Sequence, residues 1–263
     1  MNICVIGNSH VAALKQSSIQ LPYNLDFYAI PGAGAPDLIV KNGKVFPDYE
    51  SDKGVTYPDL KLGEWVRSNI PDVEKNGLDL NDYDLILYSG VGLPALRTSN
   101  KNSLNQVLYY AFLPPDYEKN NSMKCVVSKN CYEKLLFNEL ECSANICTLR
   151  LLLTHFKGKI LLQHFPIPTS HLLAQEDFDY LKSKDIPALI KWFYEKQITY
   201  IKNIIRGYDN VSYLFDVFEL VDDTGLTEHK LGSPKDAWHM NHLYGDAVLN
   251  RLQFYLDNLE KKF

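Results

Sequence analysis

The sequence predicts an α/β protein, a three-layer α/β/α sandwich in which helices cover both faces of a parallel sheet. Short apolar runs alternate along the chain with longer segments that repeat apolar residues every three or four positions. The apolar runs are nearly continuous, as expected for parallel strands buried on both faces. Five of these runs are predicted to be core strands, in the segments 3–6, 25–30, 83–90, 158–164 and 211–216.

Helices are predicted between these strands wherever apolar residues recur with helical spacing. The longest such pattern is one continuous segment from Lys129 to Phe156. Pro187 fits the first turn of the helix that it opens. The predicted helices cover residues 11–16, 59–69, 104–112, 129–156, 176–183, 187–206 and 243–259.

The chain of 263 residues is predicted to be a single domain, residues 1–263, with two insertions. The first, about 38–59, contains Lys41-Asn42-Gly43-Lys44, a sequence typical of a hairpin turn. The second, about 94–128, is rich in Asn, Pro and Tyr and is expected to shape the substrate site. Pro114-Pro115 ends the short helical pattern inside it.

The composition is that of an ordinary globular protein, with 46% hydrophobic and 22% charged residues. Lysine and arginine number 27 against 32 acidic residues, and no long basic run occurs, so nucleic acid is not an expected partner. The longest apolar runs, such as 149–154, are too short to span a membrane. We find no secretory signal pattern and expect a cytoplasmic location. The five cysteines are scattered without a C-x-x-C pair, which favours packing over metal binding.

Ser9 lies where the first apolar strand turns into the first helix, and it is the candidate nucleophile. Backbone N–H groups at such a junction are unpaired and the helix dipole is positive there, which suits a developing oxyanion. The alternative is that Ser9 only caps the helix.

A candidate base lies near the other end of the chain, in Asp236-Ala-Trp-His239. The three-residue separation allows the carboxylate to hold one ring nitrogen while the other faces a hydroxyl. His239 and His242 could instead form a metal pair, although the sequence has no His-Glu-x-x-His pattern and we expect no metal and no other cofactor. A third alternative is ligand binding without chemistry.

Gly7-Asn8-Ser9 and Asp236-x-x-His239 together resemble the SGNH (GDSL-type) hydrolase superfamily, whose members usually carry Gly-Asp-Ser first and Asp-x-x-His last. The resemblance implies a flavodoxin-like five-stranded parallel sheet with insertions. It also implies that Ser9, His239 and Asp236 form a catalytic triad. In such enzymes a glycine after the second strand lends its N–H to the oxyanion hole, and Gly32 or Gly34 stands at that place. A plain turn is the alternative for these two glycines.

The third strand departs from the family pattern. SGNH enzymes usually follow it with Gly-x-Asn, whose asparagine is an oxyanion donor, whereas this chain has Gly90-Val91-Gly92. Either the N–H groups of Gly90 and Gly92 replace that donor, or a side chain such as Arg97 does, or the oxyanion hole is weaker. His164 ends the fourth strand and could face the substrate, with a purely structural histidine as the alternative.

These features predict a serine esterase that acts on O-acyl esters through an acyl-serine intermediate. The resemblance to the superfamily implies O-acetyl esters of carbohydrates as the expected kind. One alternative is an O-acyltransferase that moves the acyl group to a sugar hydroxyl with the same triad. Another is a non-catalytic protein that binds a glycan or a small ligand. The expected partner is therefore a small-molecule or carbohydrate ester, and the sequence does not indicate an oligomeric state.

Overall fold

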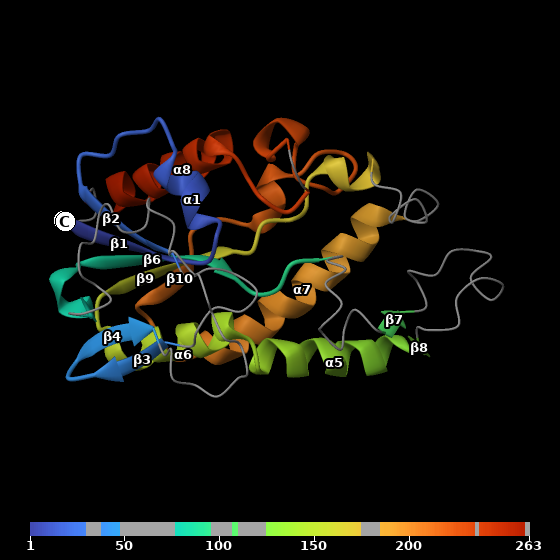
Figure 1. Ribbon diagram of the computed structural model, residues 1–263, viewed down its shortest axis with the longest axis horizontal. Helices are drawn as coiled ribbons and strands as arrows, with labels where there is room; N and C mark the ends of the chain where they lie inside the picture. Colours follow the sequence, from blue (N-terminus) through green and yellow to red (C-terminus); the bar gives the residue numbers. More distant parts are fainter. Residues whose placement is uncertain are drawn as a thin grey trace, which may run out of the picture.

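The computed structural model describes residues 1–29, 38–47, 77–95, 107–109, 125–174, 185–234 and 237–260. Within them, five parallel strands form a central sheet in the order β10-β9-β6-β1-β2 (Figure 1). Taken in chain order, these strands have the arrangement 2-1-3-4-5 of a flavodoxin-like fold, so the predicted fold class is confirmed. Their bounds are β1 (Asn2–Gly7), β2 (Asn24–Ala29), β6 (Leu85–Val91), β9 (Lys159–His164) and β10 (Val211–Tyr213).

Helices cover both faces of this sheet (Figure 1). The helices α1 (Val11–Lys15) and α8 (His242–Glu260) lie on one face, and α5 (Lys129–Glu141), α6 (Ala144–His155) and α7 (Ile186–Ile205) lie on the other. Short 3-10 helices fill several of the connections: η1 (Leu80–Asp82), η4 (Ser170–Ala174), η6 (Val217–Leu220) and η7 (His229–Leu231). Within the described ranges, no helix is both long enough and apolar enough to cross a membrane.

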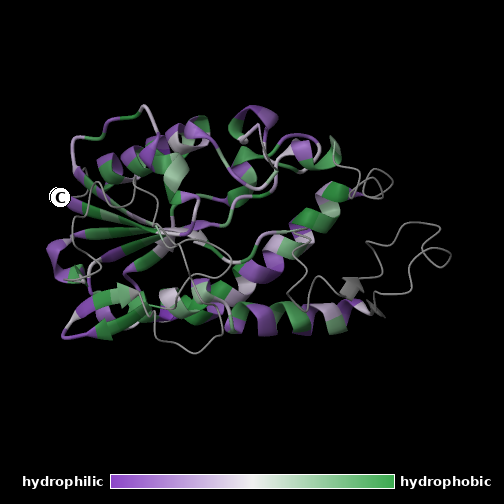
Figure 2. Cartoon of the chain, viewed as in Figure 1, coloured by the Kyte–Doolittle hydropathy of each residue, from purple (hydrophilic) through white to green (hydrophobic). Residues whose placement is uncertain are grey.

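The core strands are apolar on both sides because each side packs against helices. Successive residues of β6 point to opposite faces, so Ile86 belongs to the cluster under α5, α6 and α7 while Leu87 belongs to the cluster under α1 and α8. All seven residues of β6 are buried. Figure 2 shows the corresponding hydrophobic colouring of the strands between the two helical layers.

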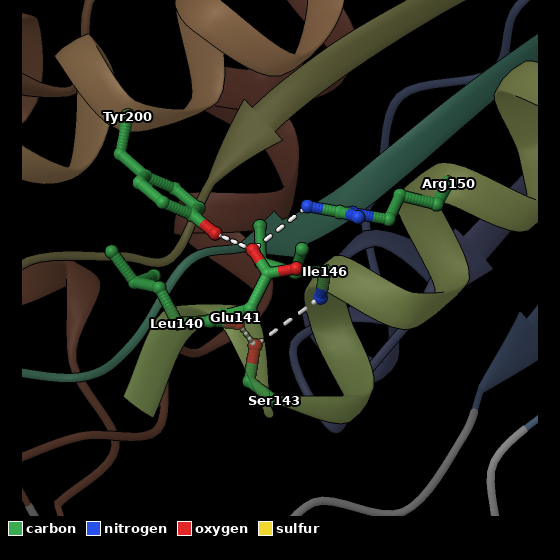
Figure 3. Close-up of polar contacts among 6 residues, drawn as sticks. All are labelled: Leu140, Glu141, Ser143, Ile146, Arg150 and Tyr200. Atoms are coloured by element: carbon green, nitrogen blue, oxygen red, sulfur yellow. Dashed lines mark hydrogen bonds and ion pairs between the residues drawn. The ribbon is translucent and has the colours of Figure 1, made fainter. Parts of the chain in front are cut away.

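The predicted single helix 129–156 is wrong, because the segment forms two helices that meet at Ser143. The Ser143 hydroxyl accepts a hydrogen bond from the N–H of Ile146 (3.2 Å) and donates one to the carbonyl of Leu140 (2.7 Å), so it caps α6 (Figure 3). Neither glycine nor proline marks the break. Glu141 ties the junction to its surroundings, since its carboxylate accepts hydrogen bonds from Tyr200 of α7 and from Arg150 (Figure 3).

The predicted helix 104–112 is also wrong over β7 (Val107–Tyr109), which pairs in parallel with β8 (Cys125–Val127). Val107 and Tyr109 are residue types that favour strands, and a partner 18 residues further on decides the conformation. The predicted helices 59–69 and 176–183 lie outside the described residues.

A small antiparallel sheet lies beside α6 (Figure 1). It contains β3 (Leu38–Lys41), β4 (Lys44–Pro47) and β5 (Leu78–Asp79), in that order. Asn42 and Gly43 join β3 to β4 with φ values of 54° and 77°, the left-handed conformation that a two-residue hairpin of this type requires.

The fifth core strand, β10, ends at Tyr213 rather than at residue 216. Asp216 instead opens η6 with a capping box, in which its carboxylate accepts from the Phe218 N–H and Glu219 bonds back to the Asp216 N–H.

Candidate active site

Ser9 lies in the turn between β1 and α1, at the carboxyl end of the sheet. The residue is half-buried between Asn8 and His10, whose side chains are buried. The N-cap position of α1 belongs to His10, and no side chain caps this helix. The geometry therefore does not give Ser9 the N-cap role that was the alternative to a nucleophile.

The backbone around Ser9 leaves one donor unused. The N–H of Val11 donates to the Asn8 carbonyl (3.1 Å), that of Ala12 donates to the Ser9 carbonyl (3.1 Å), and that of His10 donates to Oδ1 of Asn8 (3.1 Å). No residue in the described part of the chain accepts a hydrogen bond from the Ser9 N–H. Among these residues, the Ser9 N–H is therefore the donor left to bind an oxyanion at the serine.

The structure brings His239 to the Ser9 turn. The His239 ring lies 6.0 Å from the ring of His10, centroid to centroid, and His10 is the chain neighbour of Ser9. The His10 ring also meets Phe165, the first residue after β9, edge to face at 4.5 Å. His239 itself is exposed, whereas His10 is buried. Segments from the two ends of the sequence thus meet at the carboxyl end of the sheet.

The loop that carries His239 is folded back on itself. Gly232 forms an antiparallel bridge with Met240, and the Ser233 N–H donates to the His239 carbonyl (2.7 Å). Nδ2 of Asn241 donates to the carbonyls of Lys230 and Gly232, both at 2.8 Å. These bonds close the base of the loop and fix the backbone of His239.

Three further contacts attach this region to the rest of the molecule. The indole N–H of Trp238 donates to the carbonyl of Ala95 (3.1 Å), and the N–H of Thr169 donates to the carbonyl of Ala237 (2.8 Å). Oδ1 of Asn241 accepts from the N–H of Leu243 (2.9 Å) in the first turn of α8. The loop is therefore held in place by the segments that follow β6 and β9.

The chain turns sharply next to Asn8 at Gly90, in the last two residues of β6, and at Gly92, the first residue after it. We call the segment 90–93 the turn after β6. The φ values of the two glycines are +88° and +101°, a region that favours glycine. Nδ2 of Asn8 donates to the Gly90 carbonyl (3.1 Å), and a Cβ on Gly90 would lie 2.2 Å from that same nitrogen. The turn after β6 and the Ser9 turn are thus packed against each other.

His164 lies beneath this turn and is not exposed to solvent. Its ring, 3% exposed, packs against Tyr194 and Tyr213, and a Cβ on Gly92 would lie 3.1 Å from its Nε2 atom. Burial lowers the pKa of His164 to about 4, partly opposed by the contact of Nδ1 with the carbonyl of Phe165 (3.2 Å). The imidazole is therefore neutral at physiological pH. It contacts the turn after β6 at Gly92.

The described residues do not supply a metal site around His239. His242 is the first residue of α8, where it acts electrostatically on Asp246. No group of three or more metal-ligating side chains of the histidine, cysteine, aspartate or glutamate type occurs among the residues that the structure describes.

Four of the predicted site residues lie outside the described residues: Gly32, Gly34, Arg97 and Asp236. Ser9, His239, Gly90, Gly92 and His164 lie inside them. Sequence reasoning assigned no role to His10 or to two amides near the turn, Asn145 and Gln197. Proximity to Ser9 could have indicated His10, but the two amides lie within helices and carry no motif.

No protein-family model matches the chain, and no curated protein matches it in sequence. Among solved structures, one described as a candidate platelet activating factor from Streptococcus pneumonia is similar to 97% of this chain and 83% of its own, with 14% identity and a TM-score of 0.40. The fold assignment rests on the strand order of this chain and not on that similarity.

Proposed function

We propose that the chain is a serine esterase of the SGNH type that cleaves O-acyl esters, O-acetyl esters of carbohydrates among them. The observation that carries this proposal is the approach of the His239 loop to the turn that holds Ser9. A hydroxyl, an imidazole and an unused backbone N–H within one region are the parts that acyl transfer through a serine needs.

In this mechanism, His239 takes the proton of the Ser9 hydroxyl as the Ser9 oxygen forms a bond to the ester carbonyl carbon. The N–H of Ser9 stabilises the negative charge on the carbonyl oxygen. The C–O bond to the leaving alcohol then breaks, and His239 returns its proton to that alcohol. Water attacks the acyl-serine by the same route, which releases the acid and restores Ser9. Asp236 is proposed to hold the His239 ring in its productive tautomer.

Hydrolysis is preferred over transfer to a sugar hydroxyl because His239 is exposed, so water reaches the base directly. Transfer requires that an acceptor alcohol displaces this water. Product analysis with a 4-nitrophenyl acetate donor, with and without an added sugar, separates the two outcomes: acetate alone indicates hydrolysis, and an acetylated sugar indicates transfer.

The proposal is tested with a fluorophosphonate probe and intact-mass measurement. We expect one adduct on the wild-type chain, mapped to Ser9 by peptide digestion, and none on Ser9→Ala. The His239→Ala variant is expected to react at least about 10³-fold more slowly, because the serine loses its base. Ser212→Ala, which removes a different buried hydroxyl, on β10, is the matched control.

The control variant should react like the wild type. A correctly folded wild-type chain without an adduct on Ser9 contradicts the proposal. Retention of ligand binding by Ser9→Ala, in a chain that never reacts with the probe, would instead indicate the non-catalytic alternative.

A further inference from the structure

The turn after β6 is held by side-chain amides from three separate parts of the chain. Asn8, which follows β1, donates to the Gly90 carbonyl at 3.1 Å. Asn145, in the first turn of α6, donates to the Gly92 carbonyl at 2.7 Å. Gln197, in the middle of α7, bonds to the residue after the glycines, Leu93.

Gln197 makes the most complete of these contacts. Its Oε1 atom accepts from the Leu93 N–H at 2.6 Å, and its Nε2 atom donates to the Leu93 carbonyl at 3.2 Å. The residue is fully buried, with an exposed fraction of 0%. A buried amide is costly to desolvate unless both of its groups are paired, and here one backbone residue pairs both. The position of Leu93 is therefore specified by α7.

Asn145 is itself fixed by a second contact, because the hydroxyl of Tyr88 donates to the Asn145 carbonyl at 2.7 Å. Tyr88 belongs to β6 and is fully buried. The amide of Asn145 thus reaches the Gly92 carbonyl from a backbone that is tied to the same strand.

The carbonyl groups of this turn are all used. Those of Gly90, Gly92 and Leu93 accept from the three amides, and that of Val91 accepts from the Phe165 N–H at 2.8 Å. By contrast, no described residue accepts from the N–H of Gly92. The amides therefore fix the turn through its carbonyls and leave one donor uncommitted.

The turn that carries this donor is packed against the Ser9 turn. Asn8 contacts Gly90 and is the residue before Ser9, while Phe165 joins Val91 to the ring of His10, the residue after Ser9. A larger residue does not fit in place of Gly92, since a Cβ there would lie 2.8 Å from Oε1 of Gln197. Position 92 therefore accommodates only a residue without a side chain.

We propose that Gln197 and Asn145 are positioning residues that hold the Gly92 N–H as a second oxyanion donor beside that of Ser9. This inference rests on the proposed esterase function. It assigns the oxyanion contact to a backbone group whose orientation is set from two helices, α6 and α7, that carry no other part of the proposed mechanism. Loss of one oxyanion donor typically slows acyl transfer by about 10²–10³-fold.

Gln197→Glu gives the sharpest test because a carboxyl group can imitate the amide in only one of its protonation states. The protonated acid has one donor and one acceptor and can pair both groups of Leu93, whereas the carboxylate has only acceptors and would face the Leu93 carbonyl. Full burial raises the pKa of an introduced glutamic acid, so this change of state falls within the pH range of an esterase assay.

We expect the ratio of the Gln197→Glu rate to the wild-type rate to be near one at low pH and to fall about 10²-fold as the pH rises through the pKa of the new carboxyl group. Both the rate of fluorophosphonate labelling and the rate of 4-nitrophenyl acetate hydrolysis are measured. In the hydrolysis assay, we expect Gln197→Glu to reduce kcat by a larger factor than it raises KM. Taking the ratio removes the pH dependence that both chains share. Gln197→Met should react about 10²-fold more slowly at every pH.

Tyr200→Phe is the matched control, because it removes a hydrogen bond from the same helix, one turn further on, without touching the turn after β6. Its rate should equal that of the wild type, and circular dichroism verifies that each variant is folded. If Gln197→Met does not fold, the pH-dependent ratio of Gln197→Glu decides alone.

The possible failures are distinguishable. A wild-type chain that the probe labels on Ser9, with a ratio for Gln197→Glu that does not change with pH, overturns the positioning role and leaves the esterase proposal standing. A wild-type chain that is not labelled at all overturns both.

Discussion

At the scale of single residues, the candidate site depends on two glycines at which no Cβ atom could be accommodated. Gly90 and Gly92 adopt positive φ values, and each would bring a Cβ into contact with a polar side chain: Asn8 at 2.2 Å in one case and Gln197 at 2.8 Å in the other. N–H groups of these two glycines were one of three alternatives that the sequence left open for the missing oxyanion donor, beside a side chain such as Arg97 and a weaker oxyanion hole. The amides that fix the two glycines could not be predicted, because Asn145 and Gln197 reach the turn only after α6 and α7 have packed on the sheet.

We predict that Gly90→Ala lowers the free energy of unfolding by about 3 kcal/mol, since it combines a left-handed backbone with a collision against the Asn8 amide. Gly207→Ala is the matched control: its φ of +95° is similar, but no atom lies within 4 Å of the added Cβ. It should cost about 1 kcal/mol, the backbone strain alone. Urea unfolding measures both, and equal losses would show that the collision with Asn8 is relieved at no cost.

At the scale of elements, the sequence was sufficient where burial alone decides the conformation. The apolar runs predicted all five core strands, and the apolar periodicity predicted α7 and α8 to within a few residues. The break at Ser143 was missed because an N-cap serine restarts a helix without altering the apolar spacing on either side of it. The strand β7 was missed because its partner, β8, is remote in the sequence.

Asn241 joins two elements, because its carbonyl oxygen caps α8 and its amino group closes the His239 loop. Asn241→Ala should lower the free energy of unfolding by roughly 1–2 kcal/mol through loss of the cap. Asn241→Asp keeps the cap oxygen but loses both donations, to Lys230 and Gly232. We therefore expect Asn241→Asp to be the more stable variant and yet to react more slowly than wild type with the fluorophosphonate probe.

Urea unfolding and labelling rates, measured on the same samples, test this separation. Wild-type labelling by Asn241→Asp would mean that the loop does not need its amide anchors.

At the scale of the whole molecule, one buried histidine couples stability to pH. The pKa of His164 is about 4 in the folded chain and about 6.5 in the unfolded one, because burial disfavours the charged ring. Between pH 6.5 and pH 4, His164 is therefore protonated in the unfolded chain but neutral in the folded chain. The free energy of unfolding is therefore unaffected by His164 above pH 6.5, and it decreases as the pH falls from 6.5 toward 4.

We predict that the free energy of unfolding of the wild type falls by roughly 3 kcal/mol more than that of His164→Gln between about pH 7 and about pH 4. Urea unfolding of both chains at half-unit intervals measures this difference. Parallel pH profiles for the two chains would show that His164 does not titrate as its burial requires.

The sequence grouped Ser9 and His239 in one predicted site, and the rings of His10 and His239 lie 6.0 Å apart. The catalytic roles of Ser9 and His239 stay predictions. The sequence could not predict the second set of contacts on the turn after β6, which come from side chains on helices whose rotation about their own axes is set only by packing.

The three amides on that turn come from positions 8, 145 and 197, so the turn acquires its final shape only when the first strand and two late helices have all docked. In the proposed mechanism, a chain that already contains Ser9 therefore lacks the fixed turn beside the serine until α6 and α7 have docked. The proposed reactivity of Ser9 is thus confined to the completed fold.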